Sequence, residues 1–83
     1  MTKRPDTAPP AENIYEEWEE EARELIVSKM IERKLSYKAL ALRLERLGIV
    51  ESAAQLNRKI NRKRFSAAFM LACFDAMEEE TST

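Results

Sequence analysis

The sequence predicts an all-α fold, a compact domain of four helices in which the first helix is extended and acidic. The chain has 83 residues, of which 45% are hydrophobic and 35% are charged, as expected for one small folded domain. Its single Gly, and three Pro that all lie within the first ten residues, argue against strands joined by tight turns. Helix N-cap patterns at Asn13, Ser36, Ser52 and Ser66 then divide the chain into four helices.

The first helix is predicted to begin at Asn13, whose cap pattern Glu16 completes, and to end near Arg33. We expect residues 1–11 to form a disordered arm, residues 12–79 the domain, and residues 80–83 a frayed tail. Apolar residues at helical spacing predict one buried face, with acids opposite it. The face is Ile14, Trp18, Ala22, Leu25, Ile26 and Met30, and the acids are Glu16, Glu17, Glu20 and Glu24. Val27 and Ile31 extend the apolar surface, so this end should be buried or covered by a second chain.

The second helix is predicted to start after Ser36, with Leu35 and Leu40 placed to form a hydrophobic staple, and to stop at Gly48. Its expected inward face is Tyr37, Leu40, Ala41, Leu44 and Leu47.

Two shorter helices follow. Ser52 and Gln55 form a capping box for the third helix, which should end near Arg62. The third helix has only Ala53, Leu56 and Ile60 to bury, so most of its circumference should face water. Ser66 caps the fourth helix, with Phe65 and Met70 placed for a staple. Its expected inward face is Phe69, Met70, Cys73, Phe74 and Met77.

Charge is strongly segregated along the chain, although the formal net charge is only −1. Residues 5–28 contain eight acids and one Arg, whereas residues 29–64 contain eleven bases and three acids. Five of the seven residues from Arg58 to Arg64 are cationic. A nucleic acid or an acidic partner would respond to this local field rather than to the net charge.

The exposed side of the third helix carries side chains suited to DNA. Helical geometry places Ala54, Gln55, Arg58, Asn61 and Arg62 opposite the apolar stripe, flanked by Asn57 and Lys59. Amides can bond adenine and Arg can bond guanine in the major groove, while other cations match phosphates. We therefore predict base contacts from Gln55, Asn57, Arg58 and Asn61, and backbone contacts from Lys59 and Arg62. The second helix would add Tyr37, Lys38 and Arg43 to the backbone contacts.

The alternative for such a surface is that it is only solvated. Two features argue against it. The third helix contains no acid after Glu51, which leaves its cations without i,i+4 partners, and its polar residues include amides and Arg rather than Lys alone.

The segment LSYKALALRLERLGI followed by LNRKINRKR resembles the lambda-repressor-like helix-turn-helix class. More closely, about residues 25–77 resemble a family of small bacterial proteins with a helix-turn-helix-like domain of unknown function. The shared motifs are a Ser-Tyr start, Leu-Gly-Ile, Asn-Arg then Lys-Ile, and Phe-Ser-Ala-Ala-Phe. The resemblance implies recognition positions at Gln55, Asn57, Arg58 and Asn61. It also implies backbone contacts from Ser36–Lys38, Lys63 and Arg64.

The sequence departs from that pattern at Lys34 and Lys63, where the family usually has Gly at a helix end. A left-handed Lys costs on the order of 1 kcal/mol. Either these helix ends are shaped differently here, or the added charge offsets the strain in function.

Several classes of function are excluded or disfavoured by composition. The chain has no His and one Cys, so we expect no zinc site, no disulfide, no His-dependent catalysis, and hence no enzyme and no cofactor. Cys73 should be a buried core thiol, and the acids of EEWEEEARE a solvated face rather than a metal site. No signal peptide or membrane-length apolar run is seen, which predicts a cytoplasmic protein.

The sequence thus favours a small bacterial regulator of transcription that binds double-stranded DNA, with the acidic first helix facing away from the DNA. A homodimer, if formed, should use the first helix. The alternative is a protein-interaction module, an adaptor or antitoxin-like partner, that uses the basic cluster together with Trp18, Val27 and Ile31. RNA binding is third, because no exposed aromatic pair accompanies the cations.

Overall fold

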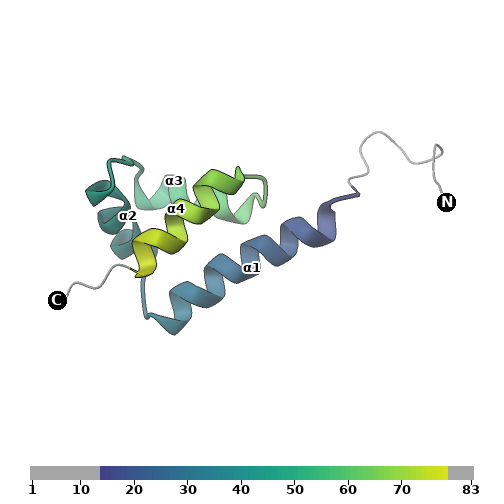
Figure 1. Cartoon of the computed structure of the whole chain (residues 1–83), viewed down its shortest axis with the longest axis horizontal. Coiled ribbons are helices and arrows are strands. Elements are labelled where there is room, and N and C mark those ends of the chain that lie inside the picture. The colour runs from purple at the N-terminus through teal and green to yellow at the C-terminus, as the bar shows by residue number, and fades with distance from the viewer. Residues whose placement is uncertain (1–13, 79–83) are drawn as a thin grey trace.

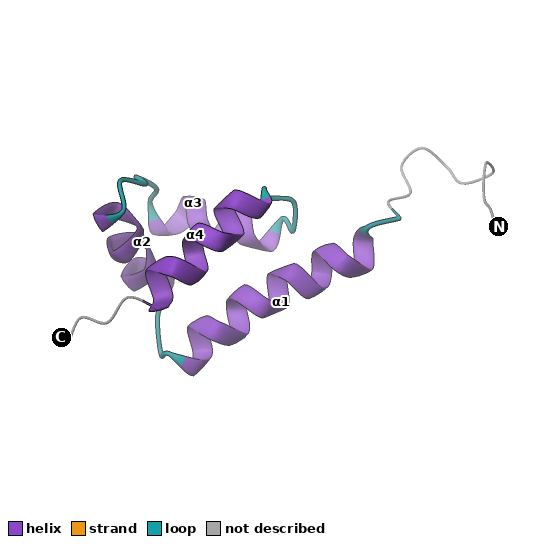
Figure 2. Cartoon of the chain, viewed as in Figure 1, coloured by secondary structure: helices purple, strands orange, loops and turns teal. Residues whose placement is uncertain are grey.

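Four helices make up the part of the chain that the computed structural model describes, residues 14–78. They are α1 (Glu16–Glu32), α2 (Tyr37–Arg46), α3 (Ala53–Asn61) and α4 (Ala67–Glu78). No strand occurs within this range, and the predicted all-α fold is confirmed (Figure 2). The predicted arm, the Asn13 cap, the boundaries at 12 and 79 and the tail lie outside the described residues.

The helices α2, α3 and α4 form a group, and the long α1 runs along it, with its N-terminal end reaching past the others (Figure 1). All four helices contribute to one core whose members are at most 5% exposed. These are Ile26, Met30, Leu40, Leu44, Leu56, Ile60, Cys73, Ala76 and Met77. The predicted inward faces of α2, α3 and α4 are confirmed with two differences. Leu47 is exposed rather than buried, and the burial of Ala76 was not predicted.

The lone Cys73 lies inside this core, as predicted. Burial, with a smaller contribution from the negative charge of Glu51, raises the pKa of its thiol to about 12. The thiol is therefore neutral and shielded, consistent with a packing role.

Serine side chains cap the three shorter helices as predicted. The backbone N–H groups of Ala39, Gln55 and Phe69 donate to the Oγ atoms of Ser36, Ser52 and Ser66 at 3.0, 3.0 and 2.9 Å. The Ser52 N–H also donates to Gln55 Oε1 at 2.8 Å, which completes the capping box.

Left-handed residues end α1, α2 and α3. Gly48 has φ +92° after α2, and the residues at the equivalent positions are Lys34 (φ 58°) and Lys63 (φ 68°). After α1, the N–H groups of Lys34 and Leu35 donate to the carbonyls of Ile31 and Met30, the pattern that Gly48 and Ile49 repeat after α2. Because both Lys residues have the positive φ that Gly48 has, these helix ends are not shaped differently, and both Lys residues carry backbone strain.

Helix α1 differs from the sequence expectation at both ends. It starts at Glu16, after Tyr15, which makes no side-chain cap. Only Ile26 and Met30 of its predicted face are buried, whereas Ile14, Trp18 and Leu25 are exposed. At about 100° per residue these three lie on a different side of the helix from Ile26 and Met30, so they do not face the core. At the other end Val27 packs on the core but Ile31 is 71% exposed, so its apolar surface is only partly covered.

Candidate nucleic-acid interface

Helix α3 is anchored from one side and open on the other. Leu56 and Ile60 are fully buried, and Ala53 is half-buried beside them. The polar residues Gln55, Asn57, Arg58, Asn61 and Arg62 are all exposed, as the helical phase predicted. Because buried side chains secure the helix, its outer face can present polar groups on a rigid support.

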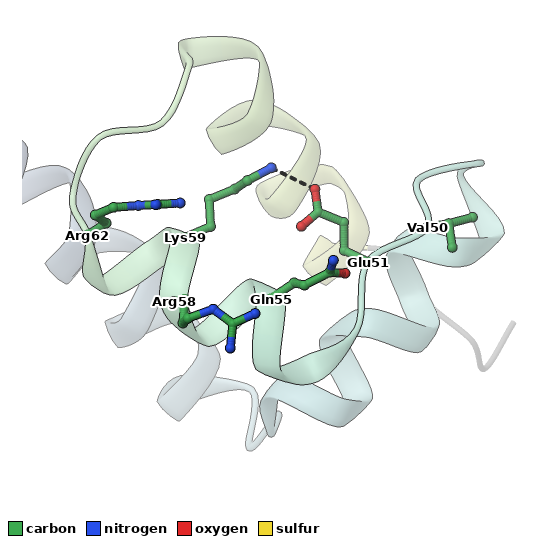
Figure 3. A pocket seen from close by; sticks show the side chains of 6 residues that line it. All are labelled: Val50, Glu51, Gln55, Arg58, Lys59 and Arg62. Carbon is green, nitrogen blue, oxygen red and sulfur yellow. Dashed lines mark hydrogen bonds and ion pairs between the residues drawn. The ribbon is translucent and has the colours of Figure 1, made fainter.

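The outer face divides into two stripes. Gln55, Arg58 and Arg62, spaced three and four residues apart, form the first, which we call the arginine stripe. With Lys59, Val50 and Glu51 they line an open hollow of about 400 Å³ (Figure 3). The side chains of Arg58 and Arg62 make no hydrogen bond or ion pair with any described residue. Their charges are therefore available to an external anion.

Lys59 is held differently from its two Arg neighbours. Its Nζ lies 2.6 Å from Glu51 Oε2 (Figure 3). The same Nζ lies 4.7 Å from the centre of the Phe69 ring. Lys59 has no i,i+4 partner on the helix, as predicted, but it is nevertheless paired with an acid. Its partner is not four residues away on the helix but in the segment that precedes the helix.

Acids of α1 pair with the cations beyond the end of α3. Lys63 Nζ lies 2.9 Å from Glu20 Oε1, and Arg64 Nε lies 3.6 Å from Glu19 Oε1. The Lys63 ammonium, followed by the Arg23 guanidinium, lowers the pKa of the Glu20 carboxyl from 4.5 to about 2. The expectation that the acidic helix lies away from the basic cluster was therefore wrong at this end, because opposite charges draw the two segments together.

Asn57 and Asn61 form the second, amide stripe, with Asn61 at the centre of a polar network. Arg23 Nη1 donates to Asn61 Oδ1 at 3.1 Å. Asn61 Nδ2 donates to Tyr37 Oη at 3.1 Å, and to the Asn57 carbonyl and Oδ1 at 2.9 and 2.7 Å. Arg23 also binds Glu20 at 2.9 Å. The network joins α1, α2 and α3.

The residues in and before α2 that were predicted to contact the DNA backbone differ in whether their side chains already have partners. Lys38 is exposed and has no partner among residues 14–78, and Ser36 serves as the cap. Arg43 differs from the prediction, because its Nη1 donates to the Ala76 and Met77 carbonyls, both at 3.3 Å. Its charge stabilises the C-terminal turn of α4, whose carbonyls lack helical partners.

A family model for a domain of unknown function (DUF6471) matches residues 18–82, most of the chain. The chain belongs to this family. No curated protein and no solved structure matches it. The match includes Glu19, Glu20 and Arg23 as well as all of α3, so both stripes and their α1 partners lie within the DUF6471 domain.

The sequence identified the outer face of this DUF6471 domain but missed three residues that organise it. These are Glu20, Arg23 and Glu51. The Glu20–Arg23 pair has i,i+3 spacing and could have been found from sequence. The contacts of Glu20 with Lys63 and of Arg23 with Asn61 could not, because they join residues about forty positions apart. Within the described range no cluster of three His, Cys, Asp or Glu side chains is placed to hold a metal, and no helix is long and apolar enough to cross a bilayer.

Proposed function

We propose that this DUF6471 domain binds double-stranded DNA as a helix-turn-helix module of a small bacterial transcription regulator, with α3 in the major groove. The observation that carries the proposal is the arginine stripe, in which the side chains of Arg58 and Arg62 are unpaired. The stripe lies on the exposed face of α3, whose opposite face is buried in the core. A helix of nine residues is about 14 Å long and suits a groove about 12 Å wide.

The surroundings of each side chain divide the predicted contacts into groups. Arg58 is suited to a guanine edge, with Asn57 beside it, whereas Arg62 and Lys38 are suited to phosphates because they are exposed and unpaired. Lys59, Lys63 and Arg64 each pair with a carboxylate of the protein, and each would have to break that ion pair to contact a phosphate of the DNA. Gln55 uses its Oε1 in the capping box and retains its amide N–H groups for a base.

Binding of fluorescent duplexes, first randomised and then selected, tests the proposal. Arg58→Ala should cost about 1–3 kcal/mol on the preferred site and flatten discrimination at one base pair. Arg62→Ala should weaken all duplexes alike and lower the magnitude of the log K against log salt slope by roughly 0.9. Arg33→Ala is the control, since it removes the same charge from a residue paired with Glu78. If both α3 variants bind every duplex as the parent does, α3 is not a DNA surface.

Exposed apolar residues on α1 favour protein contacts as a second candidate function. Trp18 is 65% exposed, and Ile14 and Leu25 lie on the same side of the helix, whereas Ile31 lies on another side. We propose that a homodimer or a protein partner uses the Ile14–Trp18–Leu25 side. Sedimentation at micromolar concentration, with and without duplex DNA, would contradict the homodimer if only monomers are found.

A further inference from the structure

We infer that Arg23 of α1 sets the base preference of α3, by fixing the carboxamide groups of Asn61 and Asn57 so that Asn57 offers hydrogen-bond donors. The inference rests on the proposed DNA-binding function and deepens it. It assigns a specificity role to a residue that lies on a different helix from the reading surface.

The orientation of Asn61 follows from the chemistry of its neighbours. Arg23 donates at 3.1 Å to one end of the Asn61 carboxamide, and a guanidinium has no acceptor. That end of the carboxamide must therefore be its oxygen. The amide nitrogen then faces Tyr37 Oη, the Asn57 carbonyl and Asn57 Oδ1, three oxygens that can accept and that share its two N–H groups. Every contact agrees with this single orientation.

The orientation of Asn57 follows from that of Asn61. The Asn61 amide donates to Asn57 Oδ1 at 2.7 Å, the shortest contact of the network, which engages the acceptor of Asn57. The Asn57 amide nitrogen has no partner among the described residues and belongs to an exposed side chain. Asn57 is thus prepared as a donor.

A prepared donor selects among bases in the major groove. Guanine presents two acceptors there, O6 and N7, whereas cytosine presents only a donor. The usual paired contact of Asn with adenine needs a donor and an acceptor that face the base together, and here Asn57 Oδ1 faces the Asn61 amide, from which it accepts. The preferred base at the Asn57 position is therefore guanine, and cytosine is the most strongly rejected.

Arg23 is itself held in place by charge. Its Nη2 bonds Glu20, and Glu20 also pairs with Lys63 beyond the end of α3. The N-terminal half of α1 has little apolar packing, so these polar contacts are what position Arg23 against Asn61. Asn61 and Arg23 act through Asn57 and are positioning residues.

The test uses the full chain and a pool of duplexes that vary at each position of the selected site. The base pair that Asn57 contacts is identified as the position of the DNA site at which Asn57→Ala abolishes base discrimination, and we call it the Asn57 position. Arg23→Lys keeps the charge but cannot hold Glu20 and Asn61 through one planar group. It should reduce guanine-over-cytosine discrimination at that position about fivefold or more, while affinity for random duplex stays within about twofold of the parent. Asn61→Ala should also reduce this discrimination, and both variants should melt close to the parent because the network is exposed.

Arg33→Lys is the matched control, the same substitution on the same helix at a residue that binds Glu78, and it should leave the preference unchanged. If Arg23→Lys and Asn61→Ala both keep the full preference of the parent, the inference is wrong while the proposed function stands. If the parent prefers cytosine at the Asn57 position, the inference is again wrong. If the parent binds no duplex, both are overturned.

Discussion

The two halves of α1 look alike in sequence but are held in different ways. The C-terminal half inserts Ile26 and Met30 into the core, where they are 0% and 5% exposed. The N-terminal half carries apolar residues at the same helical spacing, yet Trp18 remains largely exposed. That half is joined to the end of α3 and the segment after it by the polar side chains of Glu19, Glu20 and Arg23.

The difference shows that apolar residues at helical spacing identify the side chains a helix could bury, but not which of them pack against another segment. Burial of an apolar side chain contributes about 1.5–3 kcal/mol and depends little on salt, whereas an exposed ion pair contributes less than about 1 kcal/mol and is screened. The C-terminal half should therefore determine the stability of the domain. The N-terminal half should determine how acid and salt affect the end of α3.

The largest expected effect comes from the buried half. Ile26→Ala should destabilise the domain by about 2–5 kcal/mol, because it removes a fully buried side chain and leaves a cavity in a small core. Denaturant unfolding measures the change. Trp18→Ala is the matched control in the exposed half and should change the free energy of unfolding by less than about 0.5 kcal/mol. Equal losses from the two variants would mean that Trp18 is buried in solution and that the two halves do not differ.

An intermediate effect is expected at the two left-handed Lys residues. Lys34→Gly should stabilise the domain by up to about 1 kcal/mol, because Gly adopts positive φ without the Cβ strain. Lys63→Gly relieves the same strain but also removes one of the two ion-pair partners of Glu20, so its gain should be smaller. Parallel denaturation curves in low salt and in 1 M NaCl compare them. The comparison fails if Lys63→Gly is the more stabilising variant in low salt.

The smallest effect is a pH dependence in the N-terminal half. The folded-state pKa of Glu20, about 2, lies below its ordinary value of 4.5. Its carboxylate therefore stabilises the folded state fully above about pH 4.5, and this contribution is lost as the pH falls towards about 2. Glu20→Gln should be less stable than the parent at pH 7, and the difference should shrink across that window. Glu21→Gln, which removes a charge with no partner among the described residues, should show no such convergence. A constant difference from pH 7 to pH 2 would contradict the assignment.

Local signals predicted most of the fold and about half of the candidate site. The Ser36, Ser52 and Ser66 caps were predictable because each bond joins residues three positions apart. The exposure of Arg58 and Arg62 followed from the burial of Leu56 and Ile60, since helical phase relates them. The engagement of Lys59 and Arg43 did not follow, because their partners lie outside their own helices.

By itself the sequence determined the helix starts after the three Ser caps, the phase of each short helix and the basic character of α3, because these depend on spacing within one segment. Only the tertiary structure decided which cations remain unpaired, which end of α1 is buried, and how the Asn57 and Asn61 amides are oriented. Those features depend on which segments meet across long separations, as Glu20 meets Lys63 and Arg23 meets Asn61. The spacing of residues within one helix does not predict such long-range contacts, whereas the packing of four helices on one small core specifies them.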